Sequence, residues 1–538
     1  MEFWAIFVIC LALTPATFSQ KIEDAAIVIN TTMPIANTDT NYICATIDWW
    51  PHDKCNYDQC PWGYSSVINL NLSHPLLSKA IQGFKHLRLR LGGSLQDQVR
   101  YQVVDSTGPC NRFRKEKSGL FGFSKGCLSM KRWDELNNLF KKTGAIVTFG
   151  LNALNGRQHA SRFVYVGEWN SSNAREFIRY TISKGYLIDS WEFGNELSGH
   201  GIGASVGAEQ YARDVIKLNA IIEELYKNVN PKPLVLAPGG FYDKEWFTKF
   251  LKASGPRIVD AMTHHIYNLG AGNDHNLVNK ILNPQHLSKI SYTFGNLSNT
   301  IQTSGPWTSA WVGEAGGAFN SGGRNVSNTF VNSFWYLDQL GMAAKYNTKV
   351  YCRQTLVGGN YGLLDSASLA PNPDYYSALM FNQLMGKGVL DVSSDAPYLR
   401  SYAHCTRERA GVTFLLINLS NDTEFRVKVE SSRNNFVATD EATSHKHLFI
   451  HGVKRTLSWI GSKASDLALS REEYHLTPED RNIHSRTIML NGQPLQLTDV
   501  GDVPSFPSVL VDVKSAITIS PLSIKFIVFP NLNAPGCR

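Results

Sequence analysis

The sequence lacks the patterns that would indicate a metal centre, a dinucleotide site or a membrane span. Its 9 cysteines and 15 histidines stand at spacings that form no convincing zinc-binding set. No Gly-x-Gly-x-x-Gly fingerprint opens the chain, which argues against a dinucleotide-binding fold. Beyond the first residues, no apolar run approaches the length needed to cross a bilayer. We therefore expect no metal, no cofactor and no transmembrane span in the mature chain.

The sequence also lacks a strong excess of positive or negative charge. The formal net charge of +7 is modest for 538 residues. The basic residues are locally dense at 112–117, in the run Arg-Phe-Arg-Lys-Glu-Lys, and at Lys125, Lys131 and Arg132. This region could attract an acidic glycan, although a charge run is more often a solvated loop. Both interpretations stay open at this stage.

The chain begins with an apolar segment at residues 3–13 that is followed by small and polar residues. This pattern predicts a signal peptide over residues 1–19, with cleavage near Ser19 or Gln20, although the preceding residues lack the usual Lys or Arg. A membrane anchor is the alternative, but the run is short for a span. We expect a soluble, secreted protein, extracellular or in a cell wall, with a lysosomal or vacuolar destination as alternatives. Export argues against a nucleic-acid partner.

Glycosylation signals agree with export. Asn-x-Ser/Thr sequons are short enough for some to be chance matches, yet each marks a candidate glycan acceptor in a secreted protein. The sequons begin at Asn30, Asn71, Asn170, Asn296, Asn325, Asn418 and Asn421.

Removal of Cys10 with the signal peptide leaves cysteines that an oxidising compartment would allow to pair. A tight polar turn, a basic loop and the β-rich C-terminal part each contain one predicted disulfide. These pairs are Cys55–Cys60, Cys110–Cys127 and Cys405–Cys537. Cys44 and Cys352 lie inside apolar strands, and we expect them to be buried thiols.

From residue 41 the chain alternates between short apolar strands and segments of helical spacing. The predicted strands cover residues 41–48, 86–91, 145–151, 189–196, 233–238, 259–267, 310–314 and 350–357. The predicted helices cover 133–142, 174–184, 208–227, 243–253, 284–301 with an interruption at Gly295, 328–346 and 373–385.

Eight repeated β-α units predict an α/β fold, a (β/α)8 TIM barrel, with an open doubly wound sheet as the alternative. After about residue 388, short strands separated by Gly, Asn, Pro and Ser predict a C-terminal antiparallel β-sandwich. We therefore divide the chain into the signal peptide, an N-terminal segment at 20–40 that pairs with the sandwich, a catalytic barrel at 41–387 and a sandwich domain at 388–538.

Two glutamates stand at matching places in this pattern. Glu196 ends the aromatic strand that begins at Trp191, and Glu314 ends the strand that begins at Trp311. Gly follows each of them within three residues, as expected where a strand delivers a side chain into a cleft. Two such carboxylates suit glycoside hydrolysis, in which one is the acid/base and the other the nucleophile. Taken alone, Glu196 could instead be an ordinary acidic residue near a helix N-terminus.

The ordered motifs resemble the heparanase family of retaining glycosidases, glycoside hydrolase family 79. Within it they look closest to the plant heparanase-like branch, which includes the baicalin β-glucuronidase type. The resemblance spans nearly the whole mature chain, and each motif is weak alone while the ordered set is specific. The main motifs are Trp191-Glu192-Phe193-Gly194-Asn195-Glu196, Trp311-Val312-Gly313-Glu314-Ala315-Gly316-Gly317, Cys352 to Tyr361, Cys44 to Asp48, Arg90 to Ser94, His264 to Tyr267 and Glu472 to Pro478.

This resemblance implies a role for each matching residue. Glu196 would be the general acid/base and Glu314 the nucleophile. Asn195 would hydrogen-bond the sugar 2-hydroxyl, while His265 and Tyr267 would orient Glu314. The remaining sugar contacts would be Asp48, Ser94, Tyr361 and the backbone N–H groups of Gly358 and Gly359. No metal or cofactor would be needed.

The substrate is less defined than the chemistry. Some relatives carry a tyrosine after the nucleophile that meets the substrate carboxylate, whereas this chain has Phe319, which has no hydroxyl. Three functions remain: an exo-β-glucuronidase on glucuronidated glycans of the arabinogalactan type or on small glucuronides, an endo-β-glucuronidase on an acidic polysaccharide, and a catalytically silent glycan-binding protein. Tyr267 and Tyr361 could instead be core aromatic residues with no role in substrate binding, and we expect His264 to pack in the core rather than to react. The oligomeric state stays open.

Overall fold

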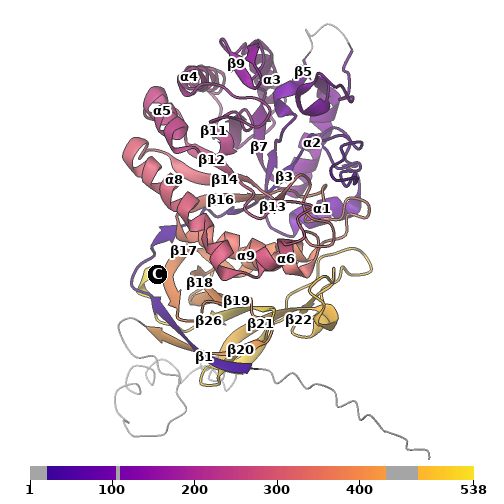
Figure 1. Cartoon of the computed structure of the whole chain (residues 1–538). Coiled ribbons are helices and arrows are strands. Elements are labelled where there is room, and N and C mark those ends of the chain that lie inside the picture. The colour runs from indigo at the N-terminus through magenta and orange to yellow at the C-terminus, as the bar shows by residue number, and fades with distance from the viewer. Residues whose placement is uncertain (1–20, 104–108, 432–469) are drawn as a thin grey trace, which may run out of the picture.

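The computed structural model describes residues 21–103, 109–431 and 470–538. The predicted signal peptide lies outside this part of the chain. Figure 1 shows two layers: a barrel ringed by helices, and below it a large β-sheet that contains both the start of the described chain and its C-terminal region. Within the described residues, every helix is too short or too polar to cross a membrane.

The barrel is closed by eight parallel strands, and all eight are the strands predicted from the sequence. The order around the barrel follows the chain, and the last strand pairs with the first. The prediction of a (β/α)8 barrel is confirmed, and the open sheet is excluded. Its strands are β3 Ile43–Ile47, β4 Arg88–Leu91, β7 Ile146–Leu151, β10 Ser190–Phe193, β11 Leu234–Phe241, β12 Ala261–Ile266, β14 Ser309–Ala315 and β16 Thr348–Arg353.

The outer helices follow the apolar periodicity. In α2, Ser129 accepts the N–H of Arg132 at the start, and Gly144 ends the helix with a φ of 68° that favours glycine. One prediction was wrong: the break in residues 284–301 lies at Lys289, and Gly295 lies inside α8. The helices are α1 Pro75–Gln82, α2 Met130–Thr143, α3 Ser172–Ser183, α4 Ala208–Leu225, α5 Lys244–Ser254, α6 Leu277–Ile281, α7 Pro284–Ser288, α8 Ile290–Ser304, α9 Phe330–Lys345 and α10 Pro373–Leu384.

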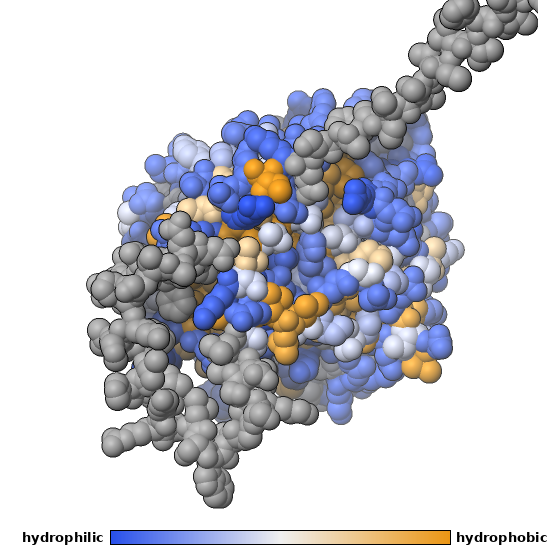
Figure 2. Space-filling model, turned by 90° about the horizontal axis from the view of Figure 1, so that it is seen from below, coloured by the Kyte–Doolittle hydropathy of each residue, from blue (hydrophilic) through white to orange (hydrophobic). Residues whose placement is uncertain are grey.

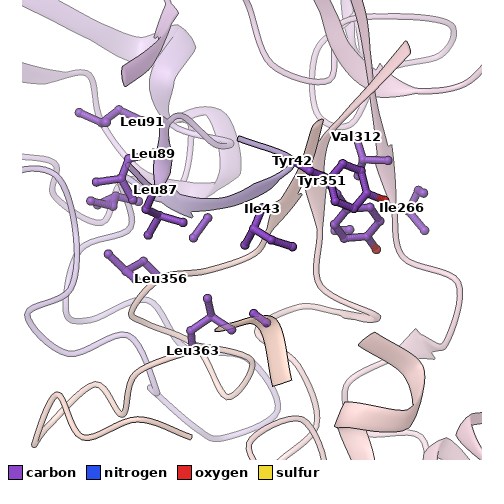
Figure 3. Packing of buried hydrophobic residues seen from close by; sticks show 14 of the residues in the cluster. Tyr42, Ile43, Leu87, Leu89, Leu91, Ile266, Val312, Tyr351, Leu356 and Leu363 are labelled. Carbon is purple, nitrogen blue, oxygen red and sulfur yellow. The ribbon is translucent and has the colours of Figure 1, made fainter. Parts of the chain in front are cut away.

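The main hydrophobic core lies between the barrel wall and the elements that cover it. Side chains of Leu89, Ile43 and Val312 come from three different barrel strands, and each is at most 2% exposed. Figure 3 shows them with Leu356 and Leu363, which belong to the loop after β16. Burial of aliphatic side chains from each strand stabilises the register of the wall. That register fixes where the strand ends deliver their polar residues.

The C-terminal sheet has 12 strands and is mixed rather than purely antiparallel, because β1 runs parallel to β20. Strand β1 also pairs antiparallel with β17. Small pairs elsewhere join β5 Val99–Gln102 to β6 Gly126–Ser129, β8 Gln158–Ser161 to β9 Val164–Val166, and β13 Gly270–Ala271 to β15 Ala318–Phe319. The large sheet contains β1 Lys21–Asn30, β2 Ala36–Asn37, β17 Met385–Ser394, β18 Leu399–Thr406, β19 Val412–Asn418, β20 Thr423–Ser431, β21 Ser470–Pro478, β22 Ile488–Leu490, β23 Gln493–Pro494, β24 Val509–Asp512, β25 Ile517–Ile519 and β26 Ser523–Phe529.

This sheet folds back on itself to enclose a second core. Side chains of β1, β20 and β25 share that core with those of β17, β18, β19 and β26. Strand β19 is buried on both faces: Phe414 and Leu416 enter the second core, while Leu415 and Ile417 enter the main core. Figure 2 views this end of the molecule, where hydrophilic residues predominate and hydrophobic ones are scattered.

Helix α9 joins the barrel to the sheet and lies between them in Figure 1. Its Asp338 is fully buried and accepts hydrogen bonds from Arg400 Nε at 2.7 Å and from Tyr402 Oη at 2.5 Å, both on β18. A buried carboxylate needs such partners to offset its loss of hydration. Strand β17 begins directly after α10, so the predicted boundary at residues 387 and 388 falls inside a strand. The barrel and the sheet therefore meet without a linker.

The three predicted disulfides are present, but the expectation for the remaining two cysteines was wrong. Cys44 and Cys352 form a fourth disulfide, with sulfurs 2.08 Å apart. Cys44 lies on β3 and Cys352 on β16, and the two residues are direct neighbours in the barrel register. Burial inside a strand predicted a thiol, but the closure of the barrel places the two sulfurs together. The predicted pairs are Cys55–Cys60, Cys110–Cys127 and Cys405–Cys537.

One of the predicted glycan acceptors has a structural task. The Asn418 side chain is fully buried, and its amide donates to the carbonyl oxygens of Thr423, Ile519 and Ser520. A glycosylated amide retains one N–H and needs space for a sugar, so it could not make these three bonds. The structure therefore argues against a glycan at Asn418. Asn421 is exposed and stays a candidate acceptor.

We predict that Asn418→Ala lowers the free energy of unfolding by about 2–4 kcal/mol, because three buried carbonyl groups lose their donor. Chemical denaturation of the purified protein measures this loss. Asn421→Ala, at the neighbouring exposed sequon, serves as the control and should change stability by less than about 0.5 kcal/mol. Glycopeptide mapping should find no sugar on Asn418, and a glycan there in the folded protein would contradict this interpretation.

Candidate active site

The two glutamates singled out in the sequence lie together at the carboxyl ends of the barrel strands. Glu196 follows β10 and Glu314 lies near the end of β14, and their exposed fractions are 7% and 6%. One carboxylate oxygen of each and one ring nitrogen of His265 all lie within 4.8 Å of one another. The carboxyl ends of barrel strands are where active sites of this fold are found. The strand ends thus bring two buried carboxylates to one point.

Glu314 is held by two donors. Tyr267 donates its hydroxyl to one carboxylate oxygen at 2.5 Å, and Arg90 Nη1 donates to the other at 3.0 Å. Glu314 is therefore both fixed in orientation and kept close to a positive charge, which suits a nucleophile.

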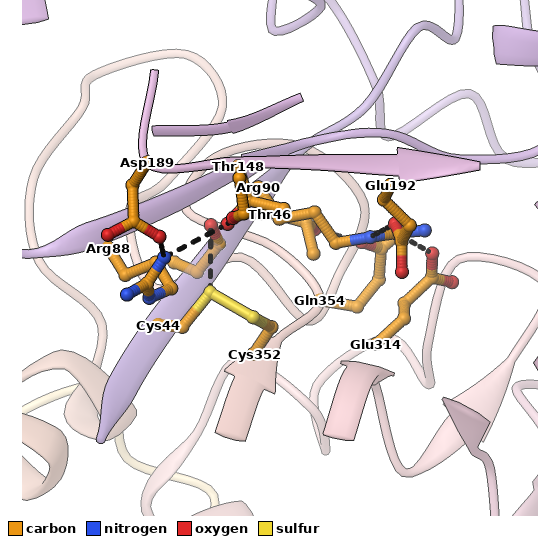
Figure 4. Close-up of a disulfide and its surroundings, with 12 residues drawn as sticks. Cys44, Thr46, Arg88, Arg90, Thr148, Asp189, Glu192, Glu314, Cys352 and Gln354 are labelled. Carbon is orange, nitrogen blue, oxygen red and sulfur yellow. Dashed lines mark hydrogen bonds and ion pairs between the residues drawn. A yellow bond between two sulfur atoms is a disulfide. The ribbon is translucent and has the colours of Figure 1, made fainter. Parts of the chain in front are cut away.

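Arg90 is the centre of a buried polar network that the sequence did not reveal. Its Nε donates to Glu192 at 2.6 Å and its Nη2 donates to the Asn195 side-chain oxygen at 2.9 Å. Arg90 is 1% exposed and Glu192 is fully buried. Figure 4 shows the guanidinium extending from β4 to Glu192 on β10 and toward Glu314 on β14. The available signal was a charged residue inside two of the predicted strands, Arg90 in 86–91 and Glu192 in 189–196, since buried charges are paired.

Glu196 is in a different environment. Its carboxylate lies within hydrogen-bond distance of His265 Nδ1, at 2.9 Å. Burial raises the pKa of Glu196 to about 7, and the positive charge of Arg90 opposes this shift with a smaller effect. Burial lowers the pKa of His265 to about 4, so this ring is neutral above that pH. The resemblance implied that His265 orients Glu314, whereas in the structure its ring hydrogen-bonds Glu196. Tyr267 alone of that pair bonds Glu314.

The backbone around Glu196 is strained, and hydrogen bonds to Gly239 and Asp97 hold it in place. Glu196 adopts a φ of 56°, a region that costs a non-glycine residue about 1–2 kcal/mol. Its N–H donates to Gly239 O at 2.7 Å. The N–H of Asn195 donates to Asp97 at 2.8 Å, and burial raises the pKa of Asp97 to about 7. Asp97, which sequence reasoning missed, fixes the turn that presents both Asn195 and Glu196.

Asp48 lines the same site after β3. Its oxygens accept the N–H of Trp49 at 2.6 Å and the amide of Gln354 at 2.8 Å. Burial and the nearby charge of Glu314 raise its pKa to about 7. Gly93 packs so closely on this carboxyl that a Cβ there would lie 2.5 Å from it, so the position requires glycine. Ser94 follows Gly93 and is partly exposed.

The loop after β16 contributes the remaining predicted contacts. Gly358 and Gly359 have φ values of 104° and 69°, which glycine adopts without strain. Tyr361 is 3% exposed and packs edge-on against Trp62, with ring centroids 6.1 Å apart. The Asn360 amide donates to Gly322 O at 3.1 Å. This loop is therefore fixed beside the end of β14.

The rim of the site includes a cation without an acidic partner among the described residues. Lys54 Nζ lies 4.2 Å from the centre of the Trp50 ring system. Burial lowers the pKa of Lys54, and the charge of Asp48 opposes that shift. Phe121 and Phe123, from the loop closed by Cys110–Cys127, pack edge-on against the same Trp50 ring. Trp50 thus contacts both Lys54 and the loop between Cys110 and Cys127, which contains the basic run at 112–117.

Glu196, His265 and Glu314 are also arranged as metal ligands can be. Glu196 and His265 Nδ1, however, already hydrogen-bond each other, and the two oxygens of Glu314 already bond to Tyr267 and the Arg90 guanidinium, which leaves His265 Nε2 without a hydrogen-bond partner among the described residues. A guanidinium in contact with Glu314 would repel a metal cation. The set therefore suits acid–base and nucleophilic chemistry better than cation binding.

Comparisons with known proteins agree with this geometry. Residues 24–341 match the family model described as "Glycosyl hydrolase family 79, N-terminal domain". The chain is 59% identical to "Heparanase-like protein 1" of Arabidopsis thaliana over 99% of this chain and 98% of that one. It is 39% identical to "Baicalin-beta-D-glucuronidase" of Scutellaria baicalensis over 98% and 95% of the two chains.

A solved structure also shares the fold. A 4-O-alpha-L-rhamnosyl-beta-D-glucuronidase from Fusarium oxysporum aligns with a TM-score of 0.62 at 14% identity, over 94% of this chain and all of that one. At this identity the likeness concerns the fold alone. The family model covers more than half of the chain, and the two plant relatives align along nearly its whole length. The chain belongs to glycoside hydrolase family 79.

Proposed function

We propose that the protein is a secreted, retaining exo-β-glucuronidase. The observation that carries the proposal is a pair of buried carboxylates in two different environments, with one oxygen of each within 4.8 Å of the other. Retaining enzymes hold their carboxyl groups about 5–5.5 Å apart, whereas inverting enzymes separate them by about 6.5–9.5 Å. No room for a water between sugar and base is left at this spacing, which favours a double displacement.

The reaction proceeds in two steps. Glu314 attacks the anomeric carbon while Glu196 gives its proton to the leaving oxygen, which forms a glycosyl-enzyme ester. Glu196 then removes a proton from water, which attacks the same carbon and releases Glu314. In this proposal Asn195, whose side-chain oxygen accepts a hydrogen bond from Arg90, donates its amide to the sugar 2-hydroxyl.

The environments match these two tasks. The pKa of about 7 keeps Glu196 protonated in mildly acidic solution, as the first step requires. Once the ester forms, Glu314 is neutral, so Glu196 can ionise without facing a second negative charge. Glu196 can then serve as the base.

Three observations support a uronic acid as the substrate. Relatives named for β-glucuronidase activity align along nearly the whole chain. The backbone of Gly358 and Gly359 beside Tyr361 suits a carboxylate. Lys54 adds a half-buried ammonium near Asp48, although Phe319, which is 42% exposed at the end of β15, offers no hydroxyl. We propose that Lys54 supplies the positive charge that attracts the substrate carboxylate.

Exo action is favoured by the loop between Cys110 and Cys127. Its Phe121 and Phe123 pack against Trp50, which follows Asp48 by two residues, so the loop forms a wall on that side of the site. Endo action stays the second candidate because this wall also carries the exposed cations Arg112, Arg114 and Lys115. Neither the packing of this loop nor its exposed cations identify the natural leaving group, which is a glycan of the arabinogalactan type or a small molecule.

We predict that Glu314→Gln lowers turnover by roughly 10³-fold or more while sugar binding persists, because an amide cannot form the ester. Glu196→Gln should impair poor leaving groups most, since activated aryl glucuronides need no proton. Steady-state kinetics on both substrate types measures this difference.

Azide provides the control for this assignment. In Glu196→Gln, added azide should intercept the glycosyl-enzyme and give a β-glucuronyl azide, whereas Glu314→Gln should give none. Equal responses of the two variants to leaving group and azide would refute the division of roles. Release of a neutral sugar but no uronic acid by the wild type would refute the substrate class alone.

We predict that kcat/KM for an unactivated glucuronide falls as the pH rises through about 7, because Glu196 must carry a proton in the first step. Well below that pH Glu196 is fully protonated, so its titration no longer increases kcat/KM as the pH falls further. A pH profile of wild-type kcat/KM measures the alkaline limb.

Asp48→Asn should retain that limb for the unactivated glucuronide, whereas Glu196→Gln should show no such limb in its residual hydrolysis of the same substrate. The comparison is needed because the pKa of Asp48 is also raised to about 7. Loss of the limb in Asp48→Asn alone would assign the titration to Asp48.

We predict that Lys54→Met raises KM for an aryl glucuronide by about fivefold and leaves the aryl glucoside unchanged, since a half-exposed charge pair is worth about 1 kcal/mol. Lys184→Met is the matched control, because Lys184 also lies over an aromatic ring, that of Tyr180, but at the end of α3. The glucuronide effect should diminish at high salt. Equal changes for both glycosides would contradict the role of Lys54.

A further inference from the structure

The position of the leaving group follows from the position of the acid. A general acid must approach the leaving oxygen within hydrogen-bond distance, at about 2.6–3.2 Å. In the proposed function Glu196 is that acid, so the first atoms beyond the bond that breaks must pass beside Glu196. Side chains next to Glu196 that face the cleft therefore contact the leaving group rather than the sugar that is held over Glu314.

Phe241 is such a side chain. It ends β11, and its ring centre lies 6.3 Å from that of His265 and 6.2 Å from that of Tyr267. His265 bonds Glu196 and Tyr267 bonds Glu314, so the ring adjoins both catalytic groups from one side.

The backbone fixes Phe241 against the acid. Its carbonyl accepts a hydrogen bond from Ser198 Oγ at 3.2 Å. The preceding Gly240 packs so tightly on Glu196 that a Cβ there would lie 3.1 Å from the Glu196 Cα atom. The position of this ring relative to the acid is therefore set by β11 and by the turn after β10.

The exposure of Phe241 is what requires an explanation. The residue is 39% exposed, although the catalytic groups around it are at least 90% buried. Several aromatic residues close to it in the barrel are fully buried, for example Phe247 and Phe250 on α5. A rigid apolar ring left open to solvent beside an acid is a binding surface for another apolar face.

We infer that Phe241 is a specificity residue that stacks on the first ring of the leaving group. The inference rests on the proposed function and adds the class of leaving group: one that begins with a ring bearing a flat apolar face. An aryl ring and the C–H face of a sugar share this chemistry. A short acyclic alcohol lacks it and leaves the Phe241 ring uncovered.

The test compares benzyl β-D-glucuronide with methyl β-D-glucuronide. Both release unactivated alcohols of similar acidity, so the demand on Glu196 is nearly the same and only the ring differs. Phe241→Ala should lower kcat/KM for the benzyl substrate by about tenfold and for the methyl substrate by less than about twofold. Phe241→Leu keeps apolar volume without a flat ring and should give a loss between these limits.

Phe163→Ala is the matched control, because Phe163 is also 39% exposed and lies at the β8–β9 turn. It should leave the benzyl-to-methyl ratio unchanged. Equal losses on both substrates in Phe241→Ala would overturn the inference, because they would indicate that the ring only supports His265 and Tyr267. No loss on either substrate would overturn it as well.

Binding separates this inference from the proposed function. In the Glu314→Gln background, calorimetric titration with each glucuronide reports affinity without turnover. Added Phe241→Ala should raise Kd for the benzyl compound by about tenfold and leave Kd for the methyl compound nearly unchanged. A wild type that hydrolyses neither compound refutes the proposed function, and the two Kd values then decide the inference about Phe241.

Discussion

The guanidinium of Arg90 is the interaction on which the site depends. It lies inside the barrel, contacts carboxylates on two other strands and holds the side chain of Asn195. Removing such a group from water is costly, and the cost is offset only when its donors meet acceptors in good geometry. Glu192 accepts one of these bonds without contributing to chemistry itself. Glu314 is therefore not the only acidic residue that contacts the guanidinium.

This charge balance separates the carboxyl groups of the site into two kinds. Glu314 has a cation and a hydroxyl as partners, whereas Glu196 and Asp48 are buried with neutral partners at hand. One cation cannot compensate every carboxylate in so small a volume, and buried groups without a charged partner retain their protons. The proposed acid and the proposed nucleophile thus differ in their access to one guanidinium.

The sequence predicted the periodic features of the fold and missed the contacts between distant segments. All eight barrel strands and the two glutamates follow from local patterns, because about ten consecutive residues are enough to show the apolar spacing of a strand and the position where it ends. The bond between Cys44 and Cys352 depends on which strand neighbours which after closure. The partner of His265 likewise depends on side-chain direction across the barrel, and the motif alone could not distinguish Glu196 from Glu314.

The Cys44–Cys352 bond joins the first barrel strand to the last, across a sequence separation of 308. Every βα loop at the catalytic face between these strands therefore belongs to one covalent ring. In the chain-entropy treatment of cross-links, a ring of this size removes about 5–6 kcal/mol of freedom from the unfolded chain. A single protease cut in any of those loops would leave both fragments attached through the sulfurs, and only reduction would separate them on a gel. These βα loops can thus be cleaved while the barrel strands stay in one molecule.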